Sequence, residues 1–232
     1  MTDFDVLVIG AGPGGYVAAI RAAQLGLKTA CADLRGKPGG TCLNVGCIPS
    51  KSLLHASQSY ADLTTGRTAA LGISHGEVSL DLEAMQDHKL ASVNALTGGI
   101  QGLFRKNKVE WIPEAAIFAA PNSVKIGEKE YTAKNIIIAT GSTPAGLEGV
   151  EIDHEAILDS TDALELGAVP TSLAVIGGGV IELEMGSIWS RLGAEVTVIE
   201  YLDEILPRMD DDVRREMNKR LASQGLSLRT GM

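Results

Sequence analysis

Short apolar runs alternate with helix-forming segments at the start of the chain. The run DVLVI at residues 5–9 is rich in β-branched side chains and ends at Gly10, so it predicts a buried strand. The segment YVAAIRAAQLG then predicts a helix that stops at Gly26, and LKTACAD predicts a second strand that ends at Asp33. This order of strand, helix and strand is typical of an α/β unit.

The same pattern returns 167 residues later, in SLAVIGGGVIELEMGSIWSRLGAEVTVIE. One register aligns four pairs of landmarks: Gly10 with Gly177, Gly12 with Gly179, Gly26 with Gly193, and Asp33 with Glu200. We therefore predict an α/β fold with two Rossmann-like, three-layer dinucleotide-binding domains in tandem. The first covers residues 1–149 and the second, which is incomplete, covers residues 150–232.

The region between the two copies is less distinctive. Helical periodicity from about Leu53 to Lys106 is followed by several short predicted strands, which end in ATGSTP. The small residues in ATGSTP are consistent with a simple turn or with backbone approach to a cofactor. Beyond the second copy, acids at residues 210–212 open a basic-ended helix, which we interpret as a solvated surface helix, and LSLRTGM resembles the start of another strand.

Glycines in both copies occur where dinucleotide-binding folds need them. In GAGPGG they allow backbone N–H groups to approach a pyrophosphate at a helix N-terminus, and a terminal carboxylate accepts hydrogen bonds from ribose hydroxyls. A single such motif can also arise from packing alone, but two copies in register argue against that explanation. An acid at Glu200 favours NAD over NADP.

One position breaks the repeat. Gly15 corresponds to Glu182, where the motif requires a glycine so that the helix can lie close to the strand. Either the helix shifts or the side chain swings outward. We expect Glu182 to weaken nicotinamide cofactor binding relative to a Glu182→Gly variant.

Composition narrows the class of protein. The 232 residues are 45% hydrophobic, include 27 glycines and carry a net charge of −9, which fits a globular α/β protein and disfavours nucleic-acid binding. No apolar run approaches 18 residues, so no membrane span is expected. The glycine motif begins at Gly10, so we expect no cleavable signal peptide in front of the folded domain. We expect a cytoplasmic location in a bacterium, or the matrix for a mature mitochondrial form.

The run GGTCLNVGCIPSK carries the candidate chemistry. Cys42 and Cys47 are five residues apart, a spacing that disfavours zinc because the chain lacks a second ligand pair. On a regular helix their side chains would point about 140° apart, so a bridge requires distortion, which Gly46 and Pro49 allow. A reversible redox disulfide is the leading hypothesis, and a disulfide that merely staples a loop is the alternative.

These motifs, together with IIIATGSTP, resemble the dihydrolipoamide dehydrogenase branch of the pyridine nucleotide-disulfide oxidoreductases. The resemblance runs from the first strand to the last residue. Glutathione and mercuric reductases share the layout with two motifs, but CLNVGCIPSK followed by SLL is most similar to the lipoamide enzyme.

The resemblance implies FAD on the first motif and NAD on the second. It assigns the following residues to the cofactors: Gly10, Gly12, Gly14, Gly15, Asp33, Gly40, Thr41, Lys51, Ala116, Thr140, Gly141 and Ser142 to FAD, and Gly177, Gly178, Gly179, Val180 and Glu200 to NAD. Ala116 stands where a glycine is often found. Lys51 matches a lysine near the flavin, and Glu184 matches the glutamate that pairs with it.

By the same resemblance, Cys42 exchanges with dihydrolipoamide and Cys47 packs against the flavin. Dihydrolipoamide would be oxidised to lipoamide through a mixed disulfide, and electrons would pass through FAD to NAD. Cys31, inside the second predicted strand, is expected to be inert core. Another flavin disulfide reductase and a non-catalytic flavin-binding fragment are the alternative functions.

Such a cycle needs a base, which in the family is a histidine of a C-terminal dimerisation domain. None of His55, His75, His88 and His154 matches it, so the chain resembles the N-terminal portion of the enzyme and is expected to be inactive alone. The full-length protein would be a homodimer. Its implied partners are lipoyl domains of 2-oxoacid dehydrogenase or glycine cleavage complexes, with no metal ion at the site.

Overall fold

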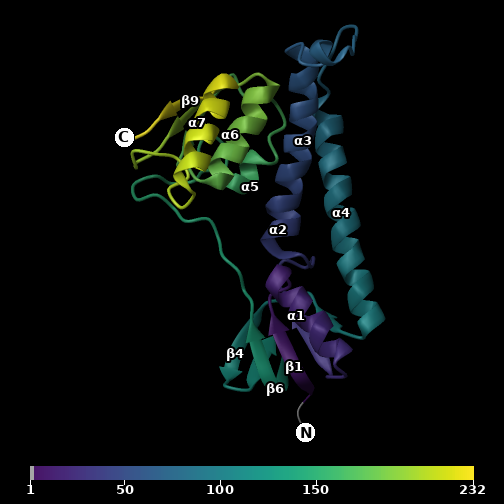
Figure 1. Ribbon diagram of the computed structural model, residues 1–232. Coiled ribbons are helices and arrows are strands. Elements are labelled where there is room, and N and C mark those ends of the chain that lie inside the picture. Colours follow the sequence, from purple (N-terminus) through teal and green to yellow (C-terminus); the bar gives the residue numbers. More distant parts are fainter. Residues whose placement is uncertain (1–2) are drawn as a thin grey trace. The chain divides into compact units, whose positions relative to one another are not determined.

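The computed structural model describes residues 3–232, which form two compact units (Figure 1). The first unit combines the chain up to Pro49 with Leu90–Ala145, and the second combines Ser50–Lys89 with Gly146–Met232. Each unit has its own sheet and core. The assignment of residues 1–149 and 150–232 to two cofactor-binding domains stays a prediction.

A six-stranded sheet forms the first unit, in the order β3-β2-β1-β6-β5-β4. Its strands are β1 (Phe4–Ile9), β2 (Thr29–Ala32), β3 (Glu110–Ile112), β4 (Ala116–Ala120), β5 (Ser123–Ile126) and β6 (Lys129–Ile138). Strands β3, β2, β1 and β6 pair in parallel, whereas β6, β5 and β4 pair as antiparallel neighbours. The long strand β6 belongs to both parts, so the sheet is continuous.

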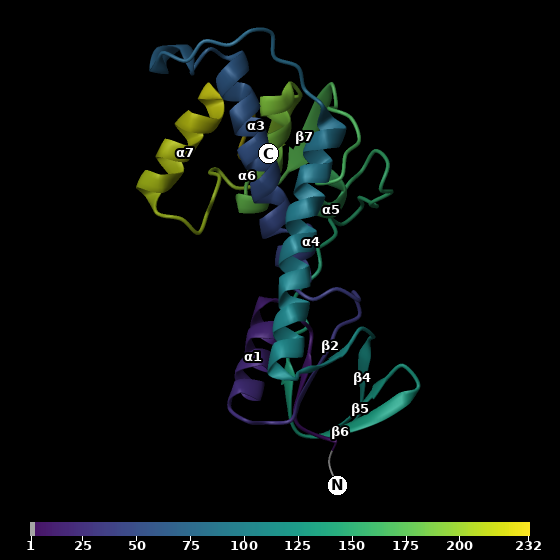
Figure 2. The same ribbon diagram turned by 90° about the vertical axis from the view of Figure 1, so that its right-hand side faces the viewer.

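Both faces of the parallel strands β1 and β2 are covered. On one face, Val8 and Cys31 pack with α1 (Pro13–Gln24) and with the C-terminal part of α4 (Leu82–Asn107), and these two helices lie side by side (Figure 2). On the other face, Leu7 packs with Val124 of β5. Burial on both faces explains why these strands are continuous apolar runs instead of alternating ones.

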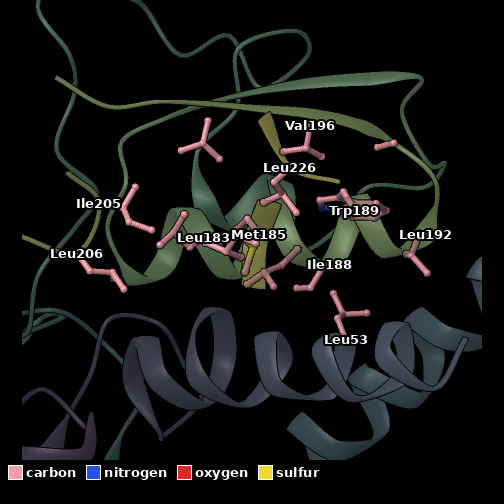
Figure 3. Close-up of a cluster of buried hydrophobic side chains, with 14 residues drawn as sticks. Leu53, Leu183, Met185, Ile188, Trp189, Leu192, Val196, Ile205, Leu206 and Leu226 are labelled. Carbon is pink, nitrogen blue, oxygen red and sulfur yellow. The ribbon is translucent and has the colours of Figure 1, made fainter. Parts of the chain in front are cut away.

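A three-stranded parallel sheet forms the centre of the second unit, in the order β7-β8-β9. Its strands and helices are β7 (Ser172–Ile176), β8 (Glu195–Ile199), β9 (Ser227–Arg229), α5 (Ser160–Ala163), α6 (Val180–Leu192) and α7 (Asp211–Ser223). Trp189 and Ile188 of α6 are fully buried, and Leu53 of α3 (Cys47–Thr64) belongs to the same core (Figure 3). The Trp189 Nε1 group donates a hydrogen bond to the carbonyl of Ala163 at 3.0 Å.

The helical periodicity predicted from about Leu53 to Lys106 corresponds to two helices. Helices α3 and α4 are separated by residues 65–81, which contain only a short 3₁₀ turn, Ala69–Leu71. Although α4 is 26 residues long, neither it nor any other helix within residues 3–232 is apolar enough to cross a bilayer.

Candidate active site

A helix break separates the two cysteines of the candidate redox pair. Cys42 lies in α2 (Gly40–Val45), Cys47 is the first residue of α3, and Gly46 between them has the non-helical angles φ −143° and ψ −114°. A Cβ atom on Gly46 would lie 3.0 Å from the carbonyl oxygen of Thr41, so the chain folds tightly against α2 at this point. The two thiols are therefore not held on opposite sides of one regular helix.

The three cysteines differ in their exposure. Cys42 is half-buried and Cys47 is exposed, whereas Cys31 is completely buried in β2. Burial, together with the charge of Asp33, raises the pKa of the Cys31 thiol to about 12. Cys31 is therefore inert core, as expected from its place in an apolar strand.

The first glycine loop is built from close backbone contacts. Gly10 has φ +99°, and a Cβ atom there would lie 2.1 Å from the Ala139 carbonyl oxygen. A Cβ atom on Gly15 would lie 1.7 Å from the Gly10 carbonyl oxygen. These distances exclude any side chain. The N-terminus of α1 has no side-chain cap, which leaves its N–H groups directed at the space above the loop.

Helix α2 begins against the same loop. A Cβ atom on Gly40 would lie 2.5 Å from the Cα atom of Gly12, whereas Gly14 has open space around it. Thr140, Gly141 and Ser142 follow β6, and Thr140 lies beside Gly10 because Ala139 donates a backbone hydrogen bond to Ile9. The structure thus brings the predicted residues 10–15, 40 and 140 to one edge of the sheet.

Asp33 fixes this loop from the end of β2. Its Oδ2 atom accepts a hydrogen bond from the Ala11 N–H at 2.7 Å, and its Oδ1 atom accepts one from the Arg35 N–H at 2.8 Å. Asp33 therefore contributes to the shape of the loop in addition to any contact with a ribose.

A hollow of about 500 Å³ lies between residues that follow β2 and β3 and residues of the β4–β5 hairpin. It is lined by Leu34, Pro113, Glu114, Ala115, Ile117, Lys125 and Gly127. In this region the sequence predicted a cofactor contact only at Ala116, at the start of β4, and not at the neighbouring residues that line the hollow. The signal that could have found them is the position of residues 113–115 directly after β3, since ligands of such sheets bind at the carboxyl ends of the strands.

The second glycine loop repeats the geometry of the first. Gly177 has φ +107°, and the Gly178 N–H donates to Glu200 Oε2 at 2.5 Å, as the Ala11 N–H donates to Asp33. The Leu202 N–H donates to Glu200 Oε1 at 2.8 Å. The offset of 167 residues therefore aligns a hydrogen bond as well as glycines.

Glu182 is where the two loops differ. Its side chain lies against the loop, because a Cβ atom on Gly177 would be 3.1 Å from Glu182 Cγ and one on Gly179 would be 2.6 Å from Glu182 Oε2. The sequence left two outcomes open, a shifted helix or a side chain that swings outward. The outward side chain is not observed, because the Glu182 side chain stays against the glycines. Val180 begins α6 beside it and is exposed.

Lys51 of α3 and Glu184 of α6 form an ion pair. Lys51 Nζ lies 2.7 Å from Glu184 Oε1 and donates to Oε2 at 2.9 Å, so both carboxylate oxygens are engaged. The lysine side chain is 59% exposed and the glutamate 21%. The pairing predicted for these two residues is present in the structure.

All four histidines are exposed. The ring nitrogens of His75 bond to the carbonyls of Gly76 and Leu63, and His154 pairs with Asp162, whose hydrogen bond and charge raise the pKa of His154. Within residues 3–232, no group of three or more His, Cys, Asp or Glu residues could hold a metal ion.

Comparisons with known proteins place this geometry in context. The family model described as pyridine nucleotide-disulphide oxidoreductase matches residues 4–232. Dihydrolipoyl dehydrogenase 3 of Pseudomonas aeruginosa is 53% identical over 236 residues, which cover 100% of this chain and 50% of that protein. The mitochondrial dihydrolipoyl dehydrogenase of Pisum sativum is 50% identical, over 97% of this chain and 46% of that protein.

A solved structure of a flavoprotein disulfide reductase also matches almost the whole of this chain. The HOCl-induced flavoprotein disulfide reductase RclA from Escherichia coli superposes with a TM-score of 0.83 at 26% identity, covering 98% of this chain and 49% of that chain. The chain thus spans about half the length of the relatives that it matches.

Proposed function

Because the chain belongs to the pyridine nucleotide-disulfide oxidoreductase family, we propose that it is the N-terminal part of a flavin-dependent dihydrolipoamide dehydrogenase with NAD as electron acceptor. The observation that carries the proposal is the position of α2. This helix holds Cys42 and begins at Gly40, which packs directly on Gly12 of the first glycine loop. The thiol pair is therefore built onto the loop that would hold the flavin nucleotide.

The first loop fits FAD. Residues Gly10 and Gly15 leave only backbone at the loop, and the uncapped N-terminus of α1 offers N–H groups to a pyrophosphate. The hollow lined by Leu34 and Glu114, among others, offers space near the carboxyl ends of β2 and β3, which supports an adenosine in that region. Bound there, FAD supplies a two-electron acceptor for the thiols.

The cysteines would carry the exchange with substrate. In the oxidised protein, a dihydrolipoamide thiolate attacks the Cys42 sulfur of a Cys42–Cys47 disulfide, which forms a mixed disulfide and releases Cys47 as a thiolate. The second dihydrolipoamide sulfur then attacks the mixed disulfide, so that lipoamide leaves and both cysteines are reduced. The N-terminus of α3 favours the negative charge on Cys47 because the positive end of the helix lies there.

Lys51 would act one helical turn beyond Cys47. Residues four apart on a helix share a face, so Lys51 places a positive charge on the same side of α3. Glu184 holds that ammonium group through two oxygens. By the family resemblance, the ammonium group held in this way would stabilise the negative charge that develops on a flavin as it is reduced.

The second unit would provide the NAD-binding domain of a tandem arrangement. Its positive-φ Gly177, the uncapped N-terminus of α6 and the Glu200 carboxylate support this assignment. Glu182 does not fit a bound dinucleotide in its present position, because its side chain covers the loop. Lipoyl domains would carry the substrate. A second copy of the full-length protein would supply the base.

The test uses the flavin-loaded full-length protein, of which this chain would be the N-terminal part, with Cys42→Ser, Cys47→Ser and, as matched control, Cys31→Ala. Anaerobic dihydrolipoamide should change the flavin absorbance of the wild type and the control but not that of the Cys42→Ser protein. Steady-state rates with lipoamide, glutathione disulfide and mercuric ion then identify the substrate class. Unchanged turnover in the Cys42→Ser protein would rule out the thiol pair, and a preference for glutathione disulfide or mercuric ion would rule out the lipoamide assignment.

A further inference from the structure

Position 182 decides how closely α6 can approach its glycine loop. In the first unit, a Cβ atom at the equivalent Gly15 would lie 1.7 Å from the Gly10 carbonyl oxygen, which is too close for two non-bonded atoms. Glu182 has a Cβ atom, so α6 must stand farther from Gly177 than α1 stands from Gly10. The helix and the loop of the second unit therefore leave room for this side chain.

The carboxylate of Glu182 fills that space. Its Oε2 atom lies 2.6 Å from the Cβ position of Gly179, and its Cγ atom lies 3.1 Å from that of Gly177. The side chain is thus folded over the loop at the start of α6. In dinucleotide-binding folds this is the place of the pyrophosphate, where helix N–H groups and the helix dipole attract negative charge.

A second carboxylate lies on the same loop. Glu200 Oε2 accepts the Gly178 N–H at 2.5 Å, as Asp33 accepts the Ala11 N–H in the first loop, so Glu182 is the carboxylate that distinguishes the second loop. An incoming diphosphate would have to displace the Glu182 carboxylate and then lie near two negatively charged side chains. Like charges brought together in this way oppose binding.

We propose that Glu182 is an internal competitor for the diphosphate of the nicotinamide dinucleotide. Its carboxylate occupies the anion position at the N-terminus of α6, so the second unit discriminates against ligands that carry a diphosphate and much less against the nucleoside alone. The inference rests on the proposed function, because it assumes that a dinucleotide is the ligand of this loop. It makes Glu182 the residue that sets the affinity for the electron acceptor.

The experiment measures binding to the flavin-loaded protein by isothermal titration calorimetry. ADP-ribose serves as the diphosphate probe and adenosine as the probe without phosphate, for wild type, Glu182→Gly and Glu182→Gln. The control is Glu195→Gln, which removes the same charge from the opposite end of β8, where Glu195 pairs with Ser172 far from the loop. Binding of NADH, followed by its fluorescence, provides a second readout.

Glu182→Gly should lower the Kd for ADP-ribose at least about tenfold, and Glu182→Gln should lower it less because the bulk of the side chain remains. Adenosine affinity should change less than about twofold, and Glu195→Gln should match the wild type. Equal ADP-ribose affinity in the wild type and Glu182→Gly, including no binding by either, would overturn the proposal. So would an equal gain in Glu195→Gln.

Flavin reduction by dihydrolipoamide, measured in the same preparations, separates this inference from the proposed function. It depends on the thiols and the first loop and requires no dinucleotide on the second. Loss of that reaction with the predicted gain in ADP-ribose affinity would count against the proposed function and leave the role of Glu182 standing.

Discussion

The first glycine loop allows a prediction with an internal control, because Gly14 and Gly15 are neighbours in the first turn of α1 with opposite surroundings. A Cβ atom on Gly15 would lie 1.7 Å from the Gly10 carbonyl oxygen, whereas one on Gly14 would meet nothing within 4 Å. Ordinary contacts of a Cβ atom begin near 3.4 Å, so Gly15→Ala must move the backbone of α1 or of the loop by well over 1 Å.

The magnitudes follow from these distances. Overpacking in a rigid interior costs about 1–3 kcal/mol, and here both partners are backbone atoms that no rotamer change can relieve, so we expect about 3 kcal/mol for Gly15→Ala. Gly14→Ala should instead stabilise the protein by about 0.5–1 kcal/mol, because alanine loses less conformational freedom than glycine when it enters a helix.

Urea unfolding followed by far-ultraviolet circular dichroism gives both free energies of unfolding, and flavin content after purification gives the effect on the loop. Gly15→Ala should also lose most of its bound flavin, since the displaced helix carries the N–H groups that would hold the pyrophosphate. The reasoning fails if Gly15→Ala unfolds within about 0.5 kcal/mol of wild type, or if Gly14→Ala destabilises the protein as much as Gly15→Ala does.

Three further outcomes follow from individual groups. Glu184→Gln should reduce the free energy of unfolding by no more than about 1 kcal/mol, because Lys51 is 59% exposed, yet it should slow flavin reduction by dihydrolipoamide in stopped-flow experiments; a larger loss of stability with normal reduction would contradict it. At pH 8, iodoacetamide should label Cys42 and Cys47 of the reduced native protein and spare Cys31, whose pKa is raised to about 12 by burial; peptide mass spectrometry would show equal labelling if this is wrong. The pKa of His154 is raised by the hydrogen bond and charge of Asp162, so the stabilisation from this pair is full below the ordinary histidine pKa and is lost as the pH rises through the raised value; an NMR titration should show Asp162→Asn returning that pKa toward its ordinary value.

Local patterns predicted the α/β units well because their signals are local. β1, α1 and β2, and likewise β7, α6 and β8, follow from short apolar runs and from glycines at the helix ends. Gly26 and Gly193 both have positive φ, the backbone conformation in which glycine ends a helix most readily. The equivalence of Asp33 and Glu200 follows from the same repeat, and each accepts a backbone N–H of its own loop.

Other features depend on contacts between distant segments and could not be read from any one pattern. Leu53 lies between the two motifs in sequence, yet it is buried in the core that contains Ile188 of α6. The partners Lys51 and Glu184 are separated by 133 positions, and only resemblance to a family paired them. The direction of the Glu182 side chain also stayed open in the sequence, because both a shifted helix and an outward side chain would relieve the crowding.

Helix α6 carries two glutamates with different roles. Residues two apart on a helix point about 160° away from each other, so Glu182 and Glu184 lie on opposite faces of α6. Glu184 faces Lys51 of α3, whereas Glu182 lies on the glycine loop at the end of β7. A substitution at Glu182 therefore leaves the ion pair with Lys51 intact. If Glu184 acts on the flavin through Lys51 and Glu182 acts on the dinucleotide, as proposed, substitution of Glu182 should change affinity for the acceptor without altering the thiol chemistry.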